Sequence, residues 1–256
     1  MHYKKSVLGE KITKIIIRLF SILAVLSLPI IIYGFNFELV AFDADLYKEQ
    51  FSKHKVYNNF EGYDIDSINQ NVLVYLSEQK NTRTESGNHS MDNRLIREDF
   101  FNEREKIHLL DVKILIVNFL SAYKFSMIFF LALLFFLALL LKFRLSVIAG
   151  IAAIIAFFGS LLTLFFAFAV FFASIMGFEG LFQKFHETFF LPETFAFDPS
   201  FEKIVVLYPE NLFFDLLAKI LTYTLFSSII ILLLSSAFLL RKFLQKFFKK
   251  IRRKTS

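Results

Sequence analysis

The sequence predicts an all-α membrane protein with four transmembrane helices and both termini in the cytoplasm. Two observations lead to this fold class: four long apolar runs and a very uneven distribution of charge. Hydrophobic residues make up 56% of the 256 positions and charged residues 20%, whereas a soluble domain is about 45–50% apolar and about 25% charged. The chain has no cysteine, which excludes disulfide scaffolds, zinc–thiolate sites and thiol catalysis.

Four apolar runs are long enough to cross the hydrocarbon core of a bilayer, which requires about 20 residues. We place the spans at about 15–35, 126–141, 145–172 and 216–240. The second run is short by itself, but apolar sequence begins upstream of it at Ile114. The first run is longer than the apolar core of a typical signal peptide and no clear cleavage site follows it. We therefore interpret it as a retained signal anchor.

The basic residues near the ends of the spans indicate the orientation. With both termini cytoplasmic, the inner side carries 15 basic residues and one acidic residue, whereas segments 36–125 and 173–215 together carry 13 basic and 22 acidic residues. We expect a single integral domain, 1–256, in the cell (plasma) membrane, with these two segments outside. The tail, 241–256, is basic and amphipathic, which favours contact with the lipid surface and not with nucleic acid.

The two outer segments have different patterns. Segment 36–125 contains a helical stretch from Ile68 to Leu76, a polar stretch from Gln79 to Asn93 that is expected to be an exposed loop, and a helix from Asp99 that leads into the second span. In segment 173–215, phenylalanines recur at helical spacing and prolines interrupt the rest. This pattern indicates an interfacial or re-entrant element.

Two of the five histidines differ from the others. His2, His54 and His89 lie at the N-terminus or in polar sequence, and we expect them to be solvated. His108 and His186 each lie on an apolar-flanked helix expected at the outer membrane surface, and they come from different outer segments. Because ionisable groups near hydrocarbon are energetically expensive, two of them on one side of the membrane indicate a function.

Three chemistries fit two histidines with nearby carboxylates. Imidazole can act as a general base or acid near neutral pH. Glu105, His108, Asp111 and His186 could instead bind a metal ion, although the motif H-E-x-x-H is absent. The third chemistry is a histidine nucleophile that forms an acyl-imidazole. A serine triad is not supported, because the chain has no G-x-S-x-G motif.

Two motifs resemble those of the lipoprotein intramolecular transacylase (Lit) family of integral membrane proteins. Residues 102–115 are similar to the family pattern E-x-E-x-x-H-x-x-D-V-K, and residues 182–190 are similar to its F-x-x-F-H helix. Residues 197–214 follow with a Pro-Glu-Phe-Phe-like entry into the fourth span. The resemblance covers most of residues 10–240.

The resemblance implies an acyltransferase. The family moves the sn-2 acyl chain of a diacylglyceryl-cysteine lipoprotein to the α-amino group of that cysteine and leaves a lyso-form lipoprotein. By resemblance, His108 and His186 are the catalytic acid–base pair, and Glu105 and Asp111 are supporting residues that orient His108 by hydrogen bonding. The implied partners are the diacylated lipoprotein and the bilayer around it, and we expect no metal and no cofactor.

Two other functions stay open on the residues alone. One is a metal-dependent membrane hydrolase that uses the Glu-x-x-His motif; the other is a non-enzymatic membrane scaffold or sensor, in which the two imidazoles would lie far apart. A transporter is not favoured, because no pair of broken helices is present. The chain departs from the family pattern in having no tryptophan: Phe195 or Phe197 occupies the place where one is expected.

Overall fold

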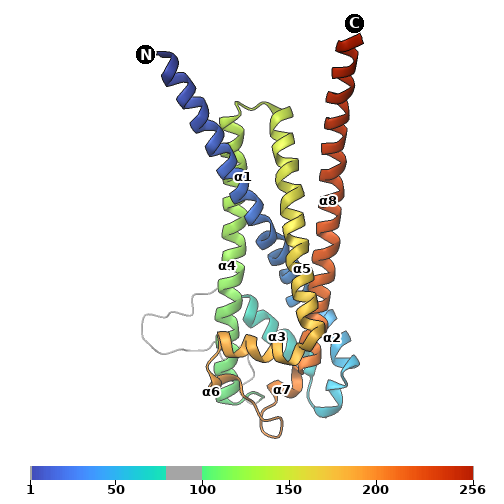
Figure 1. Cartoon of the computed structure of the whole chain (residues 1–256). Coiled ribbons are helices and arrows are strands. Elements are labelled where there is room, and N and C mark those ends of the chain that lie inside the picture. Colours follow the sequence, from blue (N-terminus) through green and yellow to red (C-terminus); the bar gives the residue numbers. More distant parts are fainter. Residues whose placement is uncertain (1, 79–99, 256) are drawn as a thin grey trace. The chain divides into compact units, whose positions relative to one another are not determined.

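The computed structural model of the protein describes residues 2–78 and 100–255, and these ranges contain helices and loops but no strand (Figure 1). The four long helices are α1 (His2–Ala41), α4 (Glu103–Leu140), α5 (Leu145–Phe189) and α8 (Glu210–Thr255). The short elements are α2 (Ala44–Lys53), the 3-10 helix η1 (Val56–Asn59), α3 (Ile65–Ser77), α6 (Pro192–Phe195) and α7 (Ile204–Leu207). The predicted loop Gln79–Asn93, with His89, lies outside the described residues.

Each long helix contains a stretch that is long and apolar enough to cross a membrane. Three of the predicted spans lie wholly within these helices, and the other extends one residue beyond Leu140, where α4 ends. Large apolar side chains on these helices are exposed; Phe165 and Leu233, for example, are 66% and 63% accessible. Lipid is the solvent that stabilises so much exposed apolar surface. The predicted fold class, an all-α membrane protein with four long apolar helices, is confirmed.

The chain divides into two compact units. The first combines residues up to 35 with 123–169 and with the chain from 222 onward, and it contains most of the apolar runs. The second combines 36–122 with 170–221. Nearly all of both predicted outer segments therefore belongs to the second unit, which also contains every residue of the candidate site.

Small residues let the helices of the first unit approach one another closely. Ser160, Thr163 and Ala167 of α5 are fully buried, and the two hydroxyl groups donate hydrogen bonds to carbonyls of their own helix. Gly34 of α1 faces Tyr123 of α4, and a Cβ atom at Gly34 would lie 2.4 Å from Cγ of that ring. The contact between α1 and α4 at this level therefore requires glycine.

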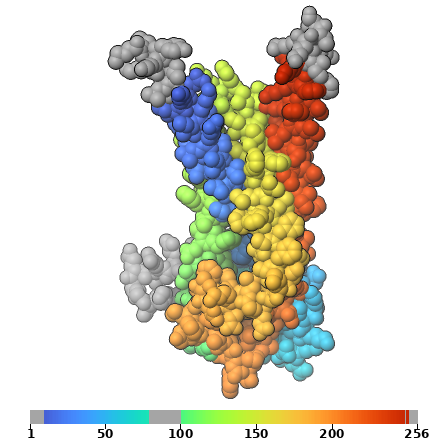
Figure 2. Space-filling view, in the orientation of Figure 1, coloured from blue at the N-terminus to red at the C-terminus, as the bar shows by residue number. Residues whose placement is uncertain are grey.

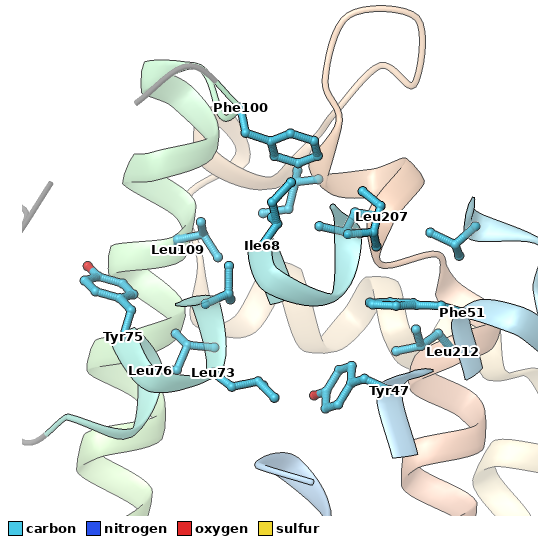
Figure 3. Close-up of a cluster of buried hydrophobic side chains, with 14 of the residues drawn as sticks. Tyr47, Phe51, Ile68, Leu73, Tyr75, Leu76, Phe100, Leu109, Leu207 and Leu212 are labelled. Atoms are coloured by element: carbon cyan, nitrogen blue, oxygen red, sulfur yellow. The ribbon is translucent and has the colours of Figure 1, made fainter. Parts of the chain in front are cut away.

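One hydrophobic core joins the elements of the second unit (Figure 3). Side chains from most helices of this unit meet in it, including Phe51 of α2, Ile68 of α3, Leu109 of α4, Leu207 of α7 and Leu212 of α8. Phe51, Leu207 and Leu212 are completely buried. Because the first turns of α4 and the segment around α7 both belong to this core, the core brings the two predicted outer segments together.

His54 is not solvated, contrary to expectation. Its Nε2 lies 2.7 Å from Oδ2 of Asp215, and Nζ of Lys53 donates to the same oxygen at 2.6 Å. The side chains of His54 and Asp215 are only 16% and 18% exposed. These contacts connect the C-terminal end of α2 to the start of α8. The local sequence could not reveal them, because the carboxylate lies 161 positions away.

We expect Gly34→Ala to destabilise the protein, because the added methyl group overlaps the Tyr123 ring and overpacking typically costs about 1–3 kcal/mol. Thermal unfolding in detergent should show a Tm several degrees below that of the wild type. Gly180→Ala is the matched control, since a Cβ atom there meets nothing within 4 Å and alanine favours helix. Equal Tm values for the two variants would contradict the close contact.

Candidate active site

His108 and His186 lie on two helical segments of the second unit whose sequences explain their positions. α4 begins with a capping box, in which Asn102 Oδ1 accepts the N–H of Glu105 at 2.9 Å and Glu105 Oε2 accepts the N–H of Asn102 at 2.7 Å. His108 follows in the next turn. α5 changes direction at Gly177, where the backbone is not helical (Figure 1). The part of α5 beyond Gly177 is the predicted phenylalanine-rich helix, and it carries His186.

The two imidazoles lie side by side. Their ring centroids are 6.0 Å apart and the ring planes differ by 21°. His108 is 8% exposed, and His186 is half-buried. The structure therefore brings the two predicted histidines into one site, and the scaffold interpretation, which requires them to lie far apart, is wrong on this point.

Phenylalanine rings surround the imidazoles, and we call these rings the aromatic box. Its members are Phe182, Phe185, Phe190, Phe195 and Phe197. Phe190 contacts both imidazoles, with centroids 5.0 Å from His108 and 5.5 Å from His186. The other rings each lie 4.3–5.6 Å from one imidazole. Both phenylalanines that stand in place of the expected tryptophan belong to the box.

The two imidazoles differ in their hydrogen bonds. His186 Nδ1 lies 2.8 Å from the carbonyl oxygen of Phe182. A carbonyl oxygen only accepts, so Nδ1 carries the proton and Nε2 of the neutral ring has a free lone pair. His108 Nδ1 is buried and has no hydrogen-bond partner in the described part of the chain. An unpaired buried polar atom costs about 1–3 kcal/mol, so a ligand that bonded to this nitrogen would gain affinity.

Both histidines lie outside the predicted spans, and both favour the neutral form at pH 7. Burial, and secondly the neighbouring His186, lower the pKa of His108 to about 4. Burial also lowers the pKa of His186, and the hydrogen bond to Phe182 opposes only part of this effect. Two neutral imidazoles offer one base and one hydrogen-bond donor without a net charge.

Neither Glu105 nor Asp111 orients His108 by the hydrogen bonds expected from the sequence. Glu105 is 1% exposed, and its oxygens accept the backbone N–H groups of Asn102 and, at 2.6 Å, of Ile204. No hydrogen bond joins Asp111 to His108, although both residues are described.

Across residues 2–78 and 100–255, no group of three or more His, Cys, Asp and Glu side chains is arranged to hold a metal ion. The four-residue metal set considered above therefore does not form.

Sequence reasoning did not single out Arg104, which lies one turn before His108. Its Nε donates to the carbonyl of Glu193 at 2.8 Å, its Nη1 donates to the carboxylate of Glu202 at 2.7 Å, and its Nη2 donates to the carbonyl of Ala196. The space-filling view shows the orange part of the chain beside the green part of α4 (Figure 2). An arginine at the start of a helix is a weak signal, because most such residues are solvated.

The fold and the imidazole pair define a class of protein: a helical, multi-pass membrane protein with a histidine site enclosed by aromatic rings. The model of the lipoprotein intramolecular transacylase family, Lit, matches residues 22–214. The chain belongs to the Lit family, and the protein is therefore an enzyme of the acyltransferase class. The family resemblance seen in the sequence motifs is confirmed.

Solved structures of the membrane-integral Lit from Bacillus cereus have the same fold. One is 21% identical in sequence, with a TM-score of 0.71 over 88% of this chain and 96% of that chain. A variant of that protein in which alanine replaces a histidine is 20% identical in sequence, with a TM-score of 0.70 over 91% of this chain and 98% of that chain. A variant in which arginine replaces a histidine is 19% identical, with a TM-score of 0.69 over 96% of this chain and 100% of that chain. No curated protein sequence matches the chain.

We expect Glu105→Ala to lower the free energy of unfolding by about 3 kcal/mol or more, because it leaves two backbone N–H groups without their acceptor and each such bond contributes about 1.5–3 kcal/mol. Thermal unfolding in detergent measures the loss, and Glu105→Gln should lose less because one acceptor oxygen remains. The control is Glu187→Ala, whose exposed carboxylate bonds only to the side chains of Gln183 and Lys184. A Tm for Glu105→Ala as high as that of Glu187→Ala would refute the anchoring role.

Proposed function

We propose that the protein moves the sn-2 acyl chain of a diacylglyceryl-cysteine lipoprotein to the α-amino group of the same cysteine, and so releases a lyso-form lipoprotein. The observation that carries the proposal is the stacked pair of His108 and His186 inside the aromatic box. Membership of the Lit family and the four apolar helices support it. The substrate is the diacylated lipoprotein in the surrounding bilayer, and the site faces the extracytoplasmic side, an orientation that the charge asymmetry supports.

The reaction is an internal exchange of an ester for an amide. The amine nitrogen attacks the sn-2 ester carbonyl, an N–C bond forms and the C–O bond to glycerol breaks. One proton moves from the nitrogen to the released glycerol oxygen. Atoms and charge balance within one molecule, so the reaction consumes no water and requires no second substrate. The protein mainly holds amine and ester together, and such positioning can lower a barrier by about 7–11 kcal/mol.

His186 is the base in this proposal. The α-amine must lose a proton when it attacks, and in water its ammonium form has a pKa near 8. The hydrogen bond from Nδ1 to the Phe182 carbonyl leaves the Nε2 lone pair as the acceptor for that proton. The same nitrogen then returns the proton to the glycerol oxygen as the C–O bond breaks, which makes His186 base and acid in turn.

His108 stabilises the oxyanion. Its Nδ1 has no partner in the described structure, so an N–H at this position can donate to the ester oxygen as negative charge develops there. A single donor of this kind can contribute about 10²–10³-fold in rate. The lowered pKa keeps the His108 ring neutral at pH 7. The ring therefore adds no positive charge beside the amine of the substrate.

We expect His108→Ala and His186→Ala each to abolish conversion of diacylated to lyso-form lipoprotein, measured by mass spectrometry, because one removes the oxyanion donor and the other the base. His54→Ala is the matched control: it removes a largely buried imidazole from the same unit outside the aromatic box and should keep the activity. Full conversion by either site variant, with the protein inserted in the membrane, would disprove the assignment.

We expect the imidazoles of His108 and His186 to titrate below pH 6.5, because burial disfavours their charged forms. Their folded-state pKa values are lower than in the unfolded chain, so both rings stay neutral at neutral pH. The base His186 is lost by protonation only as pH falls through its folded pKa value. NMR titration of the ring C–H signals in detergent micelles measures these values, with each histidine variant assigning its signal. A titration at 6.5 or above for both rings would contradict the buried site.

A further inference from the structure

Arg104 joins the start of α4 to the segment that follows α5. Its guanidinium donates to the Glu193 carbonyl at 2.8 Å, to the Ala196 carbonyl and to the Glu202 carboxylate at 2.7 Å. It also lies over the ring of Phe197, 5.1 Å from the centroid. Three donors of one side chain thus bind three points of a segment that lies about 90 positions further along the chain.

The segment folds around this guanidinium. Glu202 is 7% exposed, and its second oxygen accepts the N–H of Asp198 at 2.7 Å, so the carboxylate closes the loop from 198 to 202 on one side while it binds Arg104 on the other. The two carbonyls that Arg104 binds lie on either side of Phe195, and the second of them directly precedes Phe197.

These two phenylalanines form one wall of the aromatic box. Phe195 lies 5.5 Å from His186, and Phe197 lies 5.3 Å from His108, between centroids. Phe197 therefore contacts the guanidinium and the His108 ring at once. Since the backbone on both sides of Phe195 is held by Arg104, the position of this wall relative to the imidazoles depends on the one arginine.

We propose that Arg104 is a positioning residue of the reaction, which holds Phe195 and Phe197 against the imidazole pair and so keeps water away from it. The inference rests on the proposed function of His108 and His186. Arginine is suited to the role because its planar fork presents five N–H donors at fixed angles, whereas lysine offers a point charge on a flexible stem.

A second anchor makes the role of Arg104 separable from folding. Glu105 accepts the N–H of Ile204, and Lys203 lies over the rings of Tyr63 and Phe100 at 5.1 and 4.8 Å. The chain from 203 onward is therefore attached to the core without Arg104. Loss of Arg104 frees the wall at 193–202 and leaves the rest of the second unit in place.

Release of the wall would change the titration of His108 in a defined direction. His186, which stacks on the His108 ring, is the titratable neighbour that acts on its pKa. The ion pair of Arg104 and Glu202 lies on the other side of Phe197. Glu105 on the same helix is engaged by backbone N–H groups. Because burial is the main cause that lowers the pKa of His108, admission of water raises that pKa toward 6.5. Phe195 lies against His186, and burial is also the main cause that lowers the pKa of that base, so release of the wall raises the pKa of His186 as well. Protonation of His186 removes the base, and activity near pH 5.5 therefore falls more than activity near pH 8.

The test compares Arg104→Lys and Arg104→Gln with the wild-type protein in detergent, using conversion of a diacylated lipopeptide between pH 5 and pH 8. We expect Arg104→Gln to lower kcat by about 10- to 100-fold, since small misplacements of reacting groups cost up to about 10²-fold, and to move the acid limb to higher pH. Arg104→Lys should recover part of the rate. Lys184→Ala, which removes an exposed lysine paired only with Glu187, is the control and should match the wild type.

A role limited to stability predicts a different result. In that case Arg104→Gln would lower Tm, reduce the rate equally at all pH values and leave the acid limb and the His108 ring titration unchanged, and the inference would be wrong. If Arg104→Gln does not fold, Glu202→Gln provides the same comparison, because it weakens the ion pair and keeps the side-chain volume. Loss of activity in both histidine variants together with unchanged Arg104 variants would reject this inference and leave the proposed function standing.

Discussion

The buried carboxylate of Glu105 joins the two parts of the chain on which the site depends. One oxygen completes the capping box at the start of α4, and the other accepts the N–H of Ile204 at the start of α7. The first bond holds the turn that precedes His108. The second holds the end of the segment whose phenylalanines cover that histidine. Because hydrogen bonds to a buried carboxylate are strong and its desolvation is costly if they are lost, both ends are restrained together.

The position of His186 follows from a different constraint. α5 cannot continue straight through Gly177, so the helical segment beyond it is a separate element that packs through Phe178 and Phe182 on the first turns of α8. His186 lies one turn after Phe182 and donates to its carbonyl, which fixes the ring and its tautomer with one bond. The stacked imidazoles are thus oriented by helix geometry and aromatic packing, and not by a carboxylate.

Most of the fold could be predicted because its signals are local. Apolar length predicts the four long helices, and the helical stretch at residues 68–76 corresponds to α3. Phenylalanines at helical spacing predict the segment that carries His186. Motif resemblance and membrane depth together single out His108 and His186, which the structure brings to 6.0 Å.

The predictions failed where a side chain depends on a distant partner. Glu105 and Arg104 are adjacent in a motif with the expected histidine, but their acceptors and donors lie about 90 to 100 positions away. The pairing of His54 with Asp215 has the same origin. A single sequence does not show which distant backbone N–H groups lack a partner in the fold. A carboxylate near a histidine is therefore interpreted as the group that orients that histidine. Here Glu105 accepts backbone N–H groups and does not bond to His108.

An apolar site is suited to the proposed acyl shift because of what competes with it. Water could also attack the ester, and the result would be a free fatty acid and not an amide. The aromatic box supplies few hydrogen-bonding groups to hold water beside the imidazoles. The unpaired Nδ1 of His108 is then available to bind the ester oxygen. The tetrahedral intermediate formed by a neutral amine carries separated charges, and it is unstable in such surroundings unless the proton leaves the nitrogen at once. A neutral, fixed Nε2 on His186 meets that requirement, so the apolar walls and the free lone pair act together to favour transfer to nitrogen over hydrolysis.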